Sequence, residues 1–209
     1  MVQALADSGD PEMFDALIAT DDEYLLVCGV VGLGRRLADA AVGGAGAAHA
    51  GADTRLGEIE ARLRGHAADG RWRVREAVAM ALQRLGDADV GWCQRLAAAW
   101  ADDPDPLVQR AAVAAVCEPR LLASPPAARA AVDLCDRVTA ALSARPTSTR
   151  RSADVRTLRQ ALGYGWSVAV AADPDAGLPR FRALEGSRDP DVGWIIRENK
   201  KKSRLAKLL

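Results

Sequence analysis

A short phrase recurs along this chain: an aspartate in a turn, followed by a stretch whose apolar residues repeat with the period of an α-helix. The clearest copy follows Asp69 and ends at Gly86, a residue type that commonly stops helices. Its apolar positions fall at i, i+3, i+4, i+7, i+8 and i+11, which is one face of an α-helix. They are Val74, Ala77, Val78, Ala81, Leu82 and Leu85. One apolar face requires a neighbouring element to cover it, so the phrase predicts helices packed on helices.

Related phrases appear at four other places in the sequence. They are Asp21–Val27, in degenerate form, Asp103–Ala112, Asp154–Gly163 and Asp189–Arg197. Each of the five copies is preceded by another segment of helical period, at 10–20, 54–65, 87–100, 126–142 and 174–185. The repeating unit is therefore a helix, a turn and a second helix, and the chain is expected to hold about five helix pairs.

Composition agrees with an all-α fold. About a fifth of the residues are alanine, a strong helix former, and only 4% are aromatic. At 209 residues we expect a single domain spanning 1–209. Two segments rich in glycine or turn-forming residues, near 41–53 and 144–152, are predicted as flexible loops within it.

The recurring phrase resembles the HEAT repeats of armadillo-like proteins. The residues that carry the resemblance are Asp69, Val74, Arg75 and Ala77, and again Asp154, Val155 and Arg156. The resemblance implies a right-handed α-α superhelix, a solenoid in which each pair contacts only its neighbours. Gln109, Gly193 and Val27 stand where that family usually has arginine. A continuous ladder of arginine and aspartate contacts between repeats is therefore expected to be broken.

Several classes of function find no support in the residues. Lys plus Arg and Asp plus Glu both total 28, so no global field attracts nucleic acid or lipid. No segment has the character of a membrane span or signal peptide, and a cytoplasmic protein that binds no membrane is expected. The separated cysteines predict buried thiols rather than a disulfide framework, and two histidines predict no catalytic or metal site. We expect no cofactor and no enzymatic activity.

Two motifs that suggest ligand chemistry have simpler explanations. The glycines of Gly29–Gly34 resemble a phosphate loop, but they lie within a predicted helix and favour close helix packing. The acidic group Asp102, Asp103 and Asp105 could bind a cation, yet it flanks prolines and begins a helix, where carboxylates are favoured.

The predicted C-terminal helix, Val192–Leu209, carries the sharpest functional signal. All four lysines of the chain lie in it. Basic residues form a stripe along one side of this helix, and Trp194 lies on the same side, three residues before the first of them. The candidate binding residues there are Trp194, Arg197, Lys200, Lys201 and Arg204. The alternative is a capping helix whose outer face is polar for solubility. Three arginines on successive second helices, Arg75, Arg110 and Arg156, are further candidates on the concave surface, or pair with aspartates of adjacent turns.

The segment Gly193–Glu198 is similar to a segment of the HEAT-like alkylpurine DNA glycosylases, in which aromatic and basic residues hold the DNA backbone. That resemblance implies DNA binding or repair of alkylated bases as the alternative function. The principal expectation is a non-catalytic scaffold that binds a protein or peptide on a concave helical surface.

Overall fold

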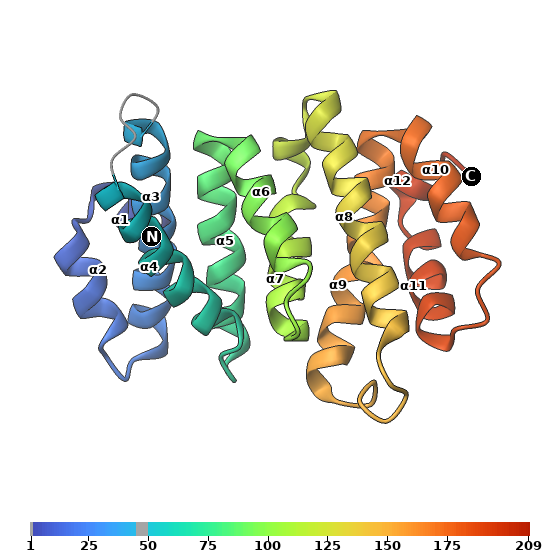
Figure 1. The fold of residues 1–209 in the computed structure, drawn as a ribbon, viewed down its shortest axis with the longest axis horizontal. Helices are drawn as coiled ribbons and strands as arrows, with labels where there is room; N and C mark the ends of the chain where they lie inside the picture. Colours follow the sequence, from blue (N-terminus) through green and yellow to red (C-terminus); the bar gives the residue numbers. More distant parts are fainter. Residues whose placement is uncertain (1, 45–49) are drawn as a thin grey trace. The chain divides into compact units, whose positions relative to one another are not determined.

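The computed structural model describes residues 2–44 and 50–209, and the side chains of residues 2–42 and 55–209. Every regular element in these ranges is a helix, which confirms the all-α class for the described chain (Figure 1).

The helices follow one another in sequential pairs, and each pair coincides with a predicted one. The pairs are α2 (Pro11–Ile18) with α3 (Glu23–Gly44), α4 (Ala50–Ala67) with α5 (Trp72–Ala88), α6 (Val90–Trp100) with α7 (Pro106–Val116), α8 (Pro125–Ala144) with α9 (Ala153–Ala172), and α10 (Pro174–Leu184) with α11 (Pro190–Lys200). Three short elements accompany them: α1 (Val2–Ser8), the 3-10 helix η1 (Pro119–Leu122) and α12 (Ser203–Ala206). The arrangement is consistent with a helical repeat.

The chain forms two compact units, the first ending at Cys93 and the second beginning at Gln94. In the first unit α3 packs against α1, α2, α4 and α5. The predicted apolar face of α5, from Val74 to Leu85, is fully buried. A Cβ on Gly34 would lie 2.4 Å from the carbonyl oxygen of Ala81, so α3 and α5 approach as closely as backbone allows. Close packing is thus confirmed for this part of the glycine motif.

In the second unit α9 is central and packs against α7, α8, α10, α11 and α12 (Figure 1). Its Trp166 is completely buried, lies 5.8 Å from the ring of Phe181, and donates an indole N–H to Thr139 Oγ1 at 2.9 Å. The thiols of Cys117 and Cys135 are also buried, with 3.5 Å between their sulfur atoms, too far for an S–S bond. Burial of the cysteines is as predicted.

The prediction of one continuous C-terminal helix from Val192 to Leu209 is wrong. α11 ends at Lys200, Lys202 is extended, and α12 begins at Ser203. The reason is the apolar spacing: Leu205 follows Ile196 by nine residues, two and a half helical turns, so an unbroken helix would point the two in opposite directions. The break lets Leu205 bury completely, on an element that packs against α9.

The two predicted loops have different outcomes. The described parts of the segment near 41–53 are helical, in α3 up to Gly44 and in α4 from Ala50, so the predicted loop was too wide; the rest lies outside the described residues. The segment 145–152 does connect α8 to α9 as a series of turns. Its predicted flexibility remains a prediction. The loop contains Arg150, whose side chain donates three hydrogen bonds.

Candidate anion-binding face

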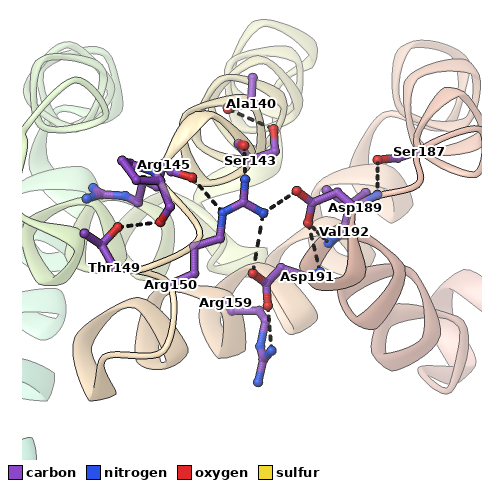
Figure 2. A network of polar contacts seen from close by, with 11 residues as sticks. Ala140, Ser143, Arg145, Thr149, Arg150, Arg159, Ser187, Asp189, Asp191 and Val192 are labelled. Atoms are coloured by element: carbon purple, nitrogen blue, oxygen red, sulfur yellow. Dashed lines mark hydrogen bonds and ion pairs between the residues drawn. The ribbon is translucent and has the colours of Figure 1, made fainter.

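Arg150, in the loop between α8 and α9, is the centre of a polar network (Figure 2). Its Nε donates to the carbonyl oxygen of Arg145 at 2.8 Å, and its two Nη atoms donate to the carbonyl oxygen of Ser143 and to Asp189. The nitrogen that bonds Asp189, Arg150 Nη1, also lies 3.8 Å from a carboxylate oxygen of Asp191. Only 14% of the Arg150 side chain is exposed and each of its three guanidinium nitrogens donates a hydrogen bond, so this group is fixed in place.

The carboxylates of this network also begin α11. Asp189 caps the helix by accepting N–H bonds from Asp191 at 2.9 Å and from Val192 at 3.3 Å. Burial acts to raise the pKa of Asp189, but hydrogen bonds from Arg150 and these two backbone groups outweigh it and hold the pKa below its ordinary value. Asp189 is therefore an anion at neutral pH that neutralises Arg150.

A second arginine of the same loop makes contacts in the other direction along the unit. Arg145 Nη2 donates to the carbonyl oxygen of Pro104 and to Gln109 Oε1, both at 3.0 Å. The Gln109 side chain is buried and its amide N–H donates to Ala101 at 2.9 Å. Gln109 thus connects the end of α6 with the α8–α9 loop. The hydrogen bonds of Arg145 and Arg150 to neighbouring pairs come from the α8–α9 loop, which sequence reasoning did not anticipate.

Arginine and aromatic side chains come together where α9 meets α11. Arg159 Nη1 donates to Asp191 at 2.6 Å, and its guanidinium carbon lies 4.6 Å from the centre of the Trp194 ring. Gly163 makes room for that ring, because a Cβ there would lie 2.6 Å from Trp194 Cζ3. The buried Asn199 fastens α11 to α9: its Oδ1 accepts from Ser167 N at 2.8 Å and its Nδ2 donates to the carbonyl oxygen of Leu162 at 2.9 Å.

Further along α9, two cations from the end of the chain, Lys202 and Arg204, lie over the ring of the exposed Tyr164. Arg204 donates to the Tyr164 hydroxyl at 3.0 Å with its guanidinium carbon 5.1 Å from the ring centre, and Lys202 Nζ lies 5.7 Å from the same centre. The residues on this side of the second unit are here called the α9 face. They are Arg156, Arg159, Tyr164, Trp194, Arg197, Lys201, Lys202 and Arg204.

The structure places the predicted C-terminal residues differently from one another. Trp194 and Arg204 contact α9 through the ring contacts just given, and Arg197 is exposed on α11. Lys201 forms an ion pair with Glu198 at 2.6 Å. Lys200 instead bonds Glu185, just beyond the end of α10, also at 2.6 Å, and so leaves the stripe. The single straight stripe is corrected to a face built from three helices.

The three predicted second-helix arginines do not form one group. Arg75 belongs to the first unit and donates to the backbone carbonyls of Asp69 and Gly70, at 2.6 and 3.0 Å. Arg110 is half-buried on α7. Arg156 is exposed and lies beside Arg159 in a cleft of the second unit. Of the three, only Arg156 joins the α9 face.

Sequence reasoning missed Arg150, Arg151, Arg159 and Tyr164 as candidates. Arg159 and Tyr164 could have been found, since they follow Arg156 by three and eight residues and share its side of the helix. The roles of Arg150 and Arg151 carried no local signal because they lie in an aperiodic loop. Tryptophans outside the face differ in burial: Trp100 and Trp166 are buried, whereas 59% of Trp72 is exposed in the first unit.

No three His, Cys, Asp or Glu side chains of the described chain gather in a way that could hold a metal ion, and none of its helices is long and apolar enough to cross a bilayer. No protein-family model and no curated protein matches this chain. Among solved structures, the crystal structure of an engineered protein aligns with 93% of this chain and 100% of its own, at 15% sequence identity and a TM-score of 0.28.

Proposed function

We propose that this protein is a non-catalytic binding scaffold that holds an acidic protein or peptide segment on the α9 face. The observation that carries the proposal is charge separation: the whole chain has a formal charge of zero, yet the α9 face contains six cationic side chains. Two carboxylates of α11 oppose them, Glu198 paired with Lys201 and Asp191 paired with Arg159, which leaves an excess of four positive charges. Such a local excess attracts and orients an anionic partner.

The type of cation favours carboxylates as the target. Four of the six are arginines, whose planar fork can bond both oxygens of a carboxylate at once. Packing against Trp194 and Tyr164 restrains two of these arginines, Arg159 and Arg204, which reduces the entropy lost when a ligand binds. The face is therefore partly organised before a partner arrives.

The proposed architecture is the right-handed HEAT-like superhelix implied by the recurring phrase. Its support within the second unit is that α9, a second helix of its pair, packs against the second helices α7 and α11 on either side. In repeat proteins of this kind the second helices line an extended binding surface.

A second candidate is a nucleic-acid backbone, with the DNA glycosylase-like activity as its special case. The gathering of lysines and arginines beside aromatic rings favours it. Cations already lie over one side of each ring, however, and a base that stacked there would have to displace them. We therefore rank the acidic peptide first.

Fluorescence anisotropy tests the choice with two labelled probes, a glutamate-rich peptide and a DNA duplex of random sequence, over a series of salt concentrations. We expect the peptide to bind and the substitution pair Arg197→Ala with Lys201→Ala to weaken it about tenfold, since each cation is worth about 0.7 kcal/mol at such a surface and about 1.4 kcal/mol is a factor of ten. The pair Arg95→Ala with Arg182→Ala removes equal charge from exposed positions on α6 and α10 and should change nothing. Tight, steeply salt-dependent binding of duplex alone would replace the peptide with nucleic acid. Binding of neither probe would reject the proposal.

A further inference from the structure

A cleft of about 560 Å³ opens at one end of the α9 face, between the α8–α9 loop, the first turns of α9 and the start of α11. Its volume is in the range of sites that hold small ligands or single side chains of a partner. The residues that line it are Thr147, Arg150, Arg151, Arg156, Arg159, Asp189, Pro190 and Asp191.

The four arginines of the cleft divide into fixed and available donors. Arg150 is held in place by Asp189 and by two backbone carbonyls (Figure 2). Arg159 uses Nη1 on Asp191, but its buried Nε has no hydrogen-bond partner. A buried N–H without an acceptor is costly, so a ligand oxygen beside it would be favourable; Arg84 and Arg145 have such an Nε too, but of the three arginines only Arg159 lines the cleft.

Arg151 and Arg156 are the available pair. Both are exposed, and no hydrogen bond or ion pair joins the guanidinium group of either to another described residue. Arg151 stands immediately before Ser152, the N-cap of α9, and Arg156 follows within the first turns of that helix. The cleft therefore has two exposed guanidinium groups without a partner among the described residues, those of Arg151 and Arg156, beside Arg150, which is held in place by its own hydrogen bonds.

The charge of the cleft suits a dianion better than a carboxylate. Four arginines face two aspartates, which leaves an excess of two positive charges. A phosphate monoester carries a charge of about −1.5 to −2 at neutral pH and presents three acceptor oxygens. A single carboxylate would leave one charge unbalanced. The N-termini of α9 and α11 add their positive dipole ends, although caps use part of their N–H groups.

We infer that this cleft binds a phosphate monoester, carried by a phosphorylated serine or threonine in the acidic segment that the α9 face holds. Arg151 and Arg156 bond the phosphate oxygens from the mouth, and the orphan edge of Arg159 bonds from within. Arg150 acts as a positioning residue that holds Asp189 and the loop. The inference rests on the proposed function and adds to it dependence on phosphorylation of the partner.

The test compares three versions of one labelled peptide of alternating glutamate and glycine, with a central serine, phosphoserine or aspartate. The full chain is expected to bind the phosphoserine version at least about tenfold tighter than the other two. Replacing Arg151 alone by alanine should lower that preference while leaving affinity for the serine version within about twofold and the melting temperature unchanged. Replacing Arg151 and Arg156 together should remove the preference and also weaken the serine version, because Arg156 belongs to the α9 face as well. The matched pair Arg95→Ala with Arg182→Ala should keep the preference.

Three results would overturn the inference, and they are separable from failure of the proposed function. Equal binding of all three peptides leaves the scaffold function standing but rejects the phosphate site. A phosphoserine preference that survives the Arg151 and Arg156 substitutions places the phosphate elsewhere. Binding to vesicles with phosphate-monoester headgroups, without preference for the phosphopeptide, makes a lipid the ligand. Inorganic phosphate is the competitor that reports on the cleft alone, and it should displace the phosphoserine peptide but not the serine peptide.

Discussion

Two turns that lead into second helices, the α4–α5 turn of the first unit and the α8–α9 loop of the second, use arginine in opposite ways. In the first, Asp69 accepts from Arg71 Nε and Nη2 at 2.9 and 2.8 Å, and Arg75 bonds the carbonyls of the same turn. In the second, Arg145 and Arg150 reach 36 and 39 residues away, to Gln109 and Asp189. In the α4–α5 turn, which best matches the repeat pattern, these arginine hydrogen bonds stay within the turn. In the irregular α8–α9 loop, they reach the neighbouring helix pairs.

The difference shows that a recurring motif need not be the element that connects repeats. A short turn keeps its charged groups within reach of their own backbone, and local hydrogen bonds satisfy them first. A longer loop can place a guanidinium between two neighbouring pairs. We expect the two sites to differ accordingly in their contribution to stability.

The largest effect is expected for Arg150→Ala. Removing this guanidinium leaves Asp189 and Asp191, whose side chains are 15% and 12% exposed, without their shared cation. The expected loss of unfolding free energy is about 3 kcal/mol, measured by urea denaturation. Arg150→Lys keeps the charge but not the fork, and should recover only part of the loss. A loss no larger than that of Arg71→Ala would remove the distinction between the two turns.

Arg145→Ala should have a smaller effect. It removes one donor from the buried Gln109 amide oxygen and one from the carbonyl of Pro104. An unsatisfied buried acceptor costs on the order of 1 to 2 kcal/mol. Urea denaturation of this variant, alone and combined with Arg150→Ala, would show whether the two loop arginines act together, since coupled groups give non-additive losses.

Acid sensitivity should separate Asp189→Asn from the unchanged chain. Because the folded pKa of Asp189 is lowered, its contribution is complete above the unfolded value, about pH 4, and is lost as the pH falls through the folded value. The variant should therefore be less stable than the unchanged chain at pH 7. The difference between their melting temperatures should become smaller toward pH 3. Thermal melts across this range provide the measurement, and a constant gap would contradict the assignment.

The smallest effect is expected for Arg71→Ala in the α4–α5 turn. The arginine side chain is 44% exposed, and its partner Asp69 retains a backbone donor, Arg71 N, at 2.8 Å. Solvent screens such pairs, so the melting temperature should move less than in either loop variant. A shift as large as that of Arg150→Ala would show that the short turn is equally important.

Much of the fold could be predicted because helical periodicity is a local property. The face from Val74 to Leu85 was identified from spacing alone, and it is buried. The C-terminal break was missed because the positions between Ile196 and Leu205 are polar and still allow a helix. Only the place available for Leu205 against α9 decides that the chain must turn there.

The candidate site was predicted only in part, for a related reason. Arg156, Trp194, Arg197, Lys201 and Arg204 were recognised because they lie on periodic elements or near a concentration of lysines. Lys200 was grouped with them, but its ion pair with Glu185 requires a neighbouring helix that spacing cannot reveal. Arg151 and Arg150 were passed over because a loop without period gives no indication of where its side chains point.

The sequence by itself determined that this chain forms paired helices with small residues where they approach, since apolar period and glycine positions act within a few residues. Only the tertiary structure decided which cations are available for a ligand. That choice depends on contacts such as Arg150 with Asp189, between residues 39 positions apart. Pairing of charges is a matter of distance in space, and distance in space is known only after the helices have packed.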